Sequence, residues 1–158
     1  MEYQKRKPIR LEKYNYTQNG YYFITVCTKD RKQLLCDKGC IIVEENHAFV
    51  LSETGNIVKK SIDNIGKIYN GINVDDYVIM PNHIHMLVRT DKNTEITISK
   101  IIQQMKGWVT KKAGFPVWQK SFYDHVIRNE NDYYEIARYI QMNPLKWQND
   151  RYYNTKIE

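Results

Sequence analysis

Two histidines separated by one residue are the clearest chemical feature of the sequence, in the segment MPNHIHMLV at residues 80–88. His83 and His85 are two of only four histidines in the chain. Side chains at positions i and i+2 of a β-strand point to the same side, so a strand here would present both imidazoles together. Such a pair can bind one divalent metal ion. The same spacing also fits two unrelated histidines at the end of a hairpin.

A metal ion needs at least one further ligand, and the segment NDYYEIARYIQMNP at residues 131–144 offers one on a predicted helix. Ile136, Tyr139, Ile140 and Asn143 recur at i, i+3, i+4 and i+7, so they share one helix face. If the two isoleucines pack on a sheet, Tyr139 and Asn143 lie at its surface. A tyrosine hydroxyl there could attack a phosphodiester that a metal ion polarises. Because the chain has 13 tyrosines, an ordinary interfacial tyrosine is the competing interpretation.

The elements that would position these residues follow from hydrophobic periodicity and turn signals. Strands are expected at residues 20–28, 74–80 and 83–90 and in the second half of 115–128, and helices at 53–70, 96–114 and 131–144. Residues 40–51 are ambiguous between strand and helix. The last helix should begin at Asn129 or Asn131 as its cap and end before Pro144. The order predicts an α+β fold, a ferredoxin-like sandwich with helices packed on an antiparallel sheet.

Length and composition indicate one globular domain over residues 1–158, since the sequence contains no repeat, low-complexity segment or linker. Residues 145–158 read as a polar tail on the surface. No apolar run approaches the ~18 residues that span a bilayer, and the basic N-terminus does not resemble a secretory signal. We therefore expect no membrane contact and a cytoplasmic location. The three cysteines lack the second pair that a zinc ribbon requires, which indicates reduced thiols.

The net charge of +6 favours an anionic partner, with nucleic acid first. Residues 100–120 hold five lysines and no acidic residue. The candidates for DNA contact are Arg6, Lys106, Lys111, Lys112, Lys120, Arg128 and Trp118. The tryptophan could stack on an unpaired base. A solvated lysine face and a core tryptophan are the competing interpretation of the same residues.

Three segments carry a resemblance to a known family. YVIMPNHIHMLV resembles the signature of the single-tyrosine HUH transposases, in which two histidines flank a hydrophobic residue. VWQKSFYDHVIRNENDYYEIARYIQMNPLKW is similar to the C-terminal signature of the branch of REP-associated tyrosine transposases. RKPIRLEKYNYTQNGYYFITVCTKDRK resembles the start of that branch. Together these matches span residues 6–147.

The resemblance implies roles for individual residues. His83 and His85 match the metal-binding histidines, and Tyr139 matches the nucleophile. Asn143 stands where the family places a further metal ligand, for which some relatives carry the longer glutamine. His125 matches a histidine that often precedes the tyrosine helix, with a structural or supporting role beside the site. The implied cofactor is a divalent metal ion, Mg²⁺ or Mn²⁺, and the implied fold is the ferredoxin-like one.

The resemblance also implies an activity: nicking and rejoining of single-stranded DNA beside a palindromic hairpin, through a 5′-phosphotyrosine intermediate and a free 3′ hydroxyl. A monomer or homodimer associated with the nucleoid is expected. Two alternatives stay open, a DNA or RNA hairpin-binding protein without strand transfer, and a metal-dependent hydrolase that uses water. Tyr123, Tyr133 and Tyr134 are the rival nucleophiles.

Overall fold

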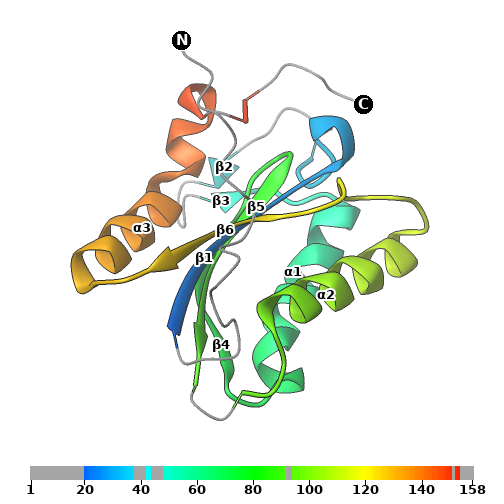
Figure 1. Cartoon of the computed structure of the whole chain (residues 1–158). Coiled ribbons are helices and arrows are strands. Elements are labelled where there is room, and N and C mark those ends of the chain that lie inside the picture. Colours follow the sequence, from blue (N-terminus) through cyan, green and yellow to red (C-terminus); the bar gives the residue numbers. More distant parts are fainter. Residues whose placement is uncertain (1–19, 38–41, 44–47, 92–93, 151, 154–158) are drawn as a thin grey trace.

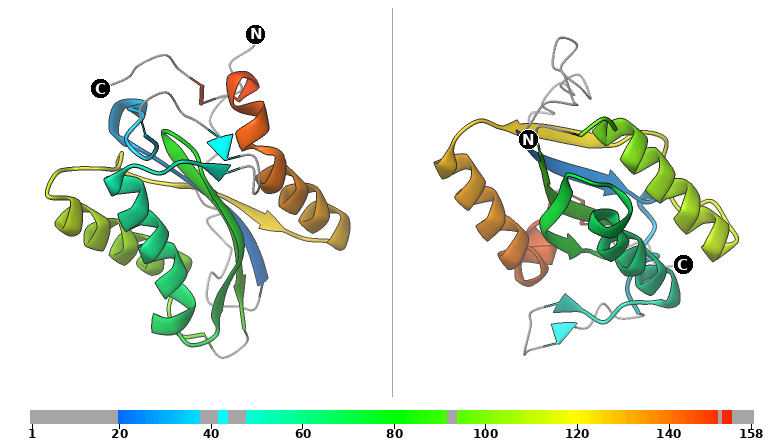
Figure 2. Two further views of the ribbon diagram at one scale, coloured as in Figure 1. Left: turned by 180° about the vertical axis from the view of Figure 1, so that it is seen from behind. Right: turned by 90° about the horizontal axis from the view of Figure 1, so that it is seen from below.

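The computed structural model describes residues 20–37, 42–43, 48–91, 94–150 and 152–153. At its centre is a four-stranded antiparallel sheet in the order β4–β5–β1–β6. The strands are β1 (Gly20–Cys27), β4 (Ile72–Ile79), β5 (His83–Thr90) and β6 (Tyr123–Ile127). Helices α1 (Glu53–Ile68) and α2 (Ile98–Ala113) cover one face, and α3 (Glu130–Met142) lies on the other (Figures 1 and 2).

The chain order β1–α1–β4–β5–α2–β6 confirms the predicted β-α-β-β-α-β sandwich. The ambiguous segment at residues 40–51 contributes a small antiparallel pair, β2 (Ile42–Val43) with β3 (Ala48–Phe49). Two short 3-10 segments, η1 (Lys29–Arg31) and η2 (Pro144–Asn149), complete the described elements. None of the described helices is long and apolar enough to cross a membrane.

The face under α1 and α2 is an apolar core. Alternate residues of β1 and β5 point into it, since a strand has a period of two: Tyr22, Ile24, Val26, Ile84, Met86 and Val88. Both helices meet them with the stripes predicted from the sequence, which are Val58, Ile62 and Ile65 on α1 and Ile98, Ile101, Ile102, Met105 and Val109 on α2. This layer fixes the register of the two central strands.

The intervening residues of the same strands face α3. Cys27 and Leu87 pack there in a second buried cluster with Ile140 of the helix, and Phe23 packs against that cluster. The β1–β5 register pairs Thr25 with His85 and Cys27 with His83. The histidine pair therefore lies on the α3 face of the sheet, among side chains that are otherwise largely apolar.

Helix α3 begins and ends where the sequence predicts. Of the two candidate caps, Asn129 is the one used, and its side chain accepts a hydrogen bond from the Asp132 backbone N–H at 2.8 Å. The helix ends at Met142, two residues before Pro144.

The expectation of a polar surface tail after residue 145 is wrong for part of that segment. Trp147 and Tyr152 are buried in the same cluster as Ile140. The chain turns back through η2 and carries these rings against the α3 face of the sheet, because an indole and a phenol ring gain most by burial. This return brings the C-terminal segment to the histidine pair.

Candidate metal and nucleophile site

The two imidazoles face each other on the α3 side of β5. His83 and His85 are both buried, their ring centroids are 4.6 Å apart, and the two Nε2 atoms are 3.1 Å apart. As the spacing predicts, the two residues lie on one face of the strand. A pair of ring nitrogens at this distance can share one cation.

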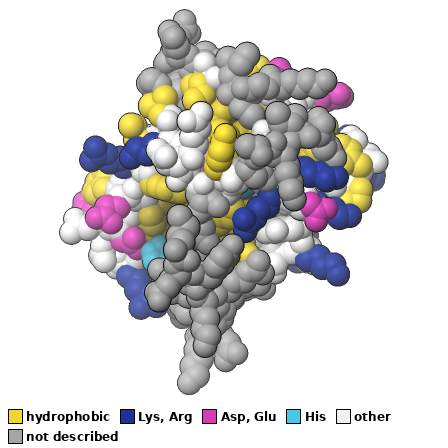
Figure 3. All heavy atoms as spheres, turned by 90° about the horizontal axis from the view of Figure 1, so that it is seen from above, with side chains coloured by type: hydrophobic (Ala, Val, Ile, Leu, Met, Phe, Trp, Pro, Cys, Tyr) yellow, Lys and Arg dark blue, Asp and Glu magenta, His cyan; other side chains and the backbone are white. Residues whose placement is uncertain are grey.

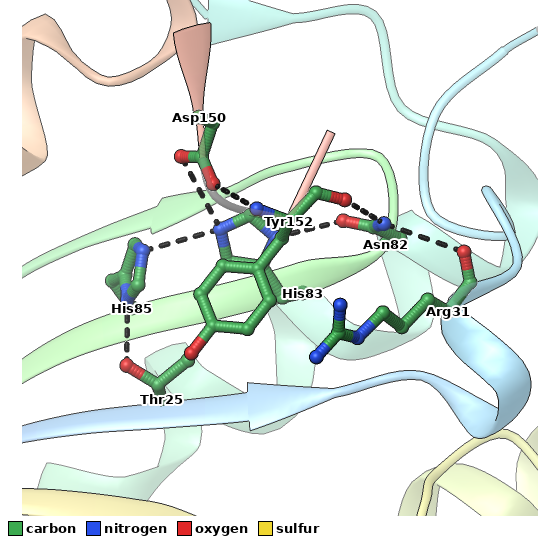
Figure 4. Close-up of polar contacts among 7 residues, drawn as sticks. All are labelled: Thr25, Arg31, Asn82, His83, His85, Asp150 and Tyr152. Carbon is green, nitrogen blue, oxygen red and sulfur yellow. Dashed lines mark hydrogen bonds and ion pairs between the residues drawn. The ribbon is translucent and has the colours of Figure 1, made fainter. Parts of the chain in front are cut away.

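The outer nitrogens of the pair are held by neighbouring side chains (Figure 4). Asn82 Oδ1 lies 2.8 Å from His83 Nδ1, and Thr25 Oγ1 lies 2.8 Å from His85 Nδ1. Metal-binding histidines usually carry such a partner on the ring nitrogen that does not bind the metal, because the partner fixes ring orientation and tautomer. Both imidazoles are therefore held in the orientation that metal binding through their Nε2 atoms would require.

A third donor, Asp150, was not foreseen from the sequence. Its Oδ2 lies 3.8 Å from His83 Nε2, and one donor atom from each of His83, His85 and Asp150 fits within a 4.8 Å span. The Asp150 side chain is only 2% exposed, and a buried carboxylate requires compensating positive charge or hydrogen bonds. The residue lies just after η2, where neither periodicity nor motif indicates a site.

Asn143, the ligand candidate on α3, is buried beside this cluster. Its Oδ1 is enclosed and has no hydrogen-bond partner in the described structure. Leaving a buried amide oxygen unpaired costs on the order of 1–3 kcal/mol, so such an atom calls for an explanation. Asn143 and Asp150 line the same pocket, which has a volume of about 430 Å³. An unpaired oxygen at this position fits a metal ligand.

The donor set fits a divalent metal ion. Imidazole nitrogens suit first-row transition metals, whereas carboxylate and amide oxygens suit Mg²⁺ and Mn²⁺. The two nitrogens and the two candidate oxygens are therefore both suitable ligands for Mn²⁺. For Mg²⁺, the two candidate oxygens are the suitable ligands.

Tyr139 is exposed at the mouth of the same pocket. The side chain is 42% exposed, and its ring packs edge-on against His85 at 5.4 Å and against Phe23 at 6.0 Å between centroids. The sequence predicted that Ile136 and Ile140 would hold the helix on the sheet, and both contribute to the cluster beneath α3. The ring is thus anchored beside the histidine pair while a large part of the side chain stays open to a ligand.

The three rival tyrosines occupy different environments. Tyr133 donates its hydroxyl to Asp75 Oδ2 at 2.9 Å. Burial, together with this carboxylate, raises its pKa to about 12, which disfavours the phenolate. Tyr134 is largely exposed on the first half of α3. Tyr123 lies on β6, where it pairs with Thr25, one strand away from His85.

His125 contacts helix α3 through Asp132. Its Nε2 lies 2.8 Å from Asp132 Oδ2, so the pair joins β6 to the first turn of α3 at an exposed position. The expected structural or supporting role of His125 stays a prediction.

The structure places the candidates for DNA contact in different environments. Lys111, Lys112, Lys120 and Arg128 are exposed, while Arg6 lies outside the described residues. The Lys106 ammonium donates to the backbone oxygens of Gln119 and Ser121 at 2.7 and 3.1 Å, so it clasps the loop before β6. Trp118 is only 8% exposed and packs with the core.

Charge on the described surface is mixed. Figure 3 shows lysine and arginine side chains on both sides and near the centre of one end of the molecule, with acidic side chains among them. The described part of this face therefore offers separate basic positions instead of one continuous patch. Lys111 and Lys120 line a groove of about 430 Å³ between α2 and the loop before β6.

Comparison with known proteins assigns the chain to a family. The sequence model of the IS200-like transposases matches residues 16–143. An uncharacterised protein of Haemophilus influenzae is 36% identical over 94% of this chain and 93% of its own length. The REP-associated tyrosine transposase of Escherichia coli is 27% identical, over 83% of this chain and 70% of its own length.

Two solved structures share the fold. A REP-associated tyrosine transposase bound to a REP hairpin superposes with a TM-score of 0.65 at 23% identity, covering 92% of this chain and 74% of that one. A putative transposase from Deinococcus radiodurans gives a TM-score of 0.51 at 20% identity, covering 84% and 95%. Because the sequence match spans most of the chain, the protein belongs to the IS200-like transposase family, with the REP-associated tyrosine transposases among its relatives.

Proposed function

We propose that the protein nicks and rejoins single-stranded DNA in a metal-dependent reaction, with Tyr139 as the nucleophile. The observation that carries the proposal is the position of one exposed tyrosine, packed edge-on against a buried pair of histidines whose Nε2 atoms face each other. Family membership supports a DNA-processing enzyme, and the geometry of the site is the reason to propose this specific chemistry.

In this proposal His83 and His85 would hold the divalent ion, with Asn143 and Asp150 as its oxygen ligands. A bound Mg²⁺ or Mn²⁺ would supply Lewis acidity at the scissile phosphate. Tyr139 Oη attacks the phosphorus and loses its proton to solvent, while the bond to the 3′ oxygen breaks and that oxygen takes up a proton. The products are a 5′-phosphotyrosine and a free 3′ hydroxyl. The phosphotyrosine bond conserves the energy for rejoining, so no nucleotide cofactor is needed.

The proposed substrate is single-stranded DNA next to a hairpin. The solved relative is described as bound to a REP hairpin, which is the reason to test this class of DNA first. The exposed positions Lys111, Lys112, Lys120 and Arg128 supply candidate phosphate contacts. The proposal includes the location and assembly expected from the sequence, which are the cytoplasm at the nucleoid and a monomer or homodimer.

A labelled hairpin oligonucleotide with single-stranded flanks tests the proposal. The protein is incubated with the 3′-labelled DNA and Mn²⁺ or Mg²⁺, and the products are run on a denaturing protein gel. We expect a covalent band that needs the metal ion. Retention in native gels without any adduct would support the hairpin-binding alternative, and cleavage without adduct would support a hydrolase that uses water.

A further inference from the structure

Asn82 lies at the centre of the contacts that orient His83. The residue is fully buried, and its Nδ2 donates to the backbone oxygens of Tyr152 at 2.7 Å and of Arg31 at 3.3 Å. Backbone oxygens only accept hydrogen bonds, so the nitrogen of the amide must be the atom that faces them. This fixes the rotation of the amide and directs Oδ1 toward His83 Nδ1 (Figure 4).

The backbone of Asn82 is fixed as well. Its carbonyl oxygen accepts a hydrogen bond from the Thr28 N–H at 3.0 Å, and the Thr28 hydroxyl, which donates to the backbone oxygen of Lys32 at 2.7 Å, lies 3.1 Å from it. The residue cannot easily rotate or withdraw. An amide oxygen is only an acceptor, so His83 Nδ1 must carry a hydrogen, and in the neutral ring His83 Nε2 is then unprotonated. Asn82 therefore holds His83 in the tautomer that a metal ligand requires.

His85 has a different partner. Thr25 Oγ1 faces His85 Nδ1 at 2.8 Å, and a hydroxyl can either donate or accept a hydrogen bond. The Nε2 atoms of the two rings are 3.1 Å apart, which is a hydrogen-bond distance. When both rings are neutral, this contact is a hydrogen bond only if His85 Nε2 carries the hydrogen and Thr25 donates to Nδ1.

We infer that Asn82 and Thr25 are positioning residues that divide the histidine pair into a locked ligand and a switching ligand. His83 keeps its hydrogen on Nδ1 throughout. His85 carries its hydrogen on Nε2 in the metal-free protein and on Nδ1 when a metal ion is bound. Thr25 changes from donor to acceptor by rotation of its hydroxyl, and the number of protons on the pair stays the same.

This inference rests on the metal-binding role proposed above for the pair, but not on DNA cleavage. Long-range ¹H–¹⁵N correlation spectra of the imidazole rings test it directly, at an alkaline pH where an ordinary imidazole is neutral. We expect His83 to have a protonated Nδ1 with and without Mg²⁺. We expect His85 to change from a protonated Nε2 to a protonated Nδ1 on addition of Mg²⁺. A His85 ring with the same tautomer in both samples would overturn the switch.

Matched variants separate position from packing. Thr25→Val keeps the shape of the side chain and removes the hydroxyl, whereas Thr25→Ser keeps the hydroxyl. Loss of such a partner typically weakens metal binding by roughly 10–100-fold. We expect that loss for Thr25→Val, measured from the EPR signal of free Mn²⁺, and recovery with Thr25→Ser. Asn82→Asp should also weaken Mn²⁺ binding, because it sets a carboxylate against two backbone oxygens.

The variant His85→Ala distinguishes failure of the inference from failure of the metal site. If His85→Ala binds Mn²⁺ as tightly as the unaltered protein, the metal-binding role of the pair is wrong and the inference falls with it. If His85→Ala loses Mn²⁺ while a folded Thr25→Val protein binds it normally, only the positioning role of Thr25 is wrong.

Discussion

The two faces of the central sheet are built from alternate residues of the same strands and have opposite characters. On the face under α1 and α2, β5 contributes Ile84, Met86 and Val88 to an apolar core. On the face under α3, the same strand contributes His83 and His85, which form hydrogen bonds with Asn82 and Thr25. Alternate residues of β5 therefore face the apolar core on one side of the sheet and the candidate site on the other.

The difference teaches how a buried polar site can be tolerated in a small protein. The apolar face sets the strand register, and a slip by one residue would exchange the two faces completely. Each imidazole that is turned to the other face meets a polar partner, so desolvation of its outer nitrogen is offset by a hydrogen bond. Stability and function can then be altered separately, and the following variants test this separation.

The largest contrast should come from neighbouring residues of β5. His83→Ala and His85→Ala should each abolish cleavage while the protein stays folded, because each removes a proposed metal ligand but little of the main core. Ile84→Ala should instead lower the free energy of unfolding by about 2–5 kcal/mol and keep cleavage at low temperature. Cleavage with Mn²⁺ or Mg²⁺, circular dichroism and urea unfolding measure both effects. Full cleavage by either histidine variant would refute the metal assignment.

The oxygen donors should show a smaller effect of the same kind. Asn143→Ala removes one candidate ligand, and Asp150→Asn removes the negative charge of another; both variants leave the two histidines in place. We expect Mn²⁺ affinity to fall roughly tenfold or more for each variant. Asn149→Ala is the matched control, since Asn149 lines the same pocket but is exposed. Equal affinities for Asp150→Asn and the control would remove Asp150 from the site.

Tyr133 should contribute to stability and not to chemistry. Tyr133→Phe removes the hydrogen bond to Asp75 and should lower the free energy of unfolding by roughly 1 kcal/mol, with the DNA adduct unchanged. The pKa is raised from an ordinary ~10 to about 12, so the unfolded chain loses this proton first. The contribution is present below pH ~10 and is lost as pH rises through about 12. A stability difference that grows toward higher pH would contradict this sign.

The smallest effect concerns single lysines on the α2 side. Lys111→Ala should weaken hairpin binding slightly and reduce the log–log salt slope by about 0.7–0.9, as expected for one lost phosphate contact. Lys106→Ala should lower the free energy of unfolding and leave the salt slope of DNA binding unchanged, because its ammonium donates to the carbonyls of Gln119 and Ser121. Binding titrations at several salt concentrations measure both slopes. Identical slopes for Lys111→Ala and the unaltered protein would exclude Lys111 from the DNA path.

The sequence predicted those parts of the site that lie on regular elements. The period of two in a strand correctly placed His83 and His85 on one face. The helical period correctly placed Tyr139 and Asn143 together, and both line one pocket. Asp150 and Tyr152 were missed because they follow η2, where no repeat indicates which side chains turn inward. Asn82 was visible only as a turn residue, since its role depends on backbone oxygens of two distant segments.

The identity of the nucleophile is the most direct test of the whole account. Trapping the covalent product with a hairpin oligonucleotide and mapping the modified peptide by mass spectrometry assigns the phosphotyrosine to one residue. We predict Tyr139, and we predict that Tyr139→Phe abolishes the adduct while retaining hairpin binding and stability, because the change removes one oxygen and keeps the ring against His85 and Phe23. An adduct on Tyr123, Tyr133 or Tyr134, or one that persists in Tyr139→Phe, would contradict the account.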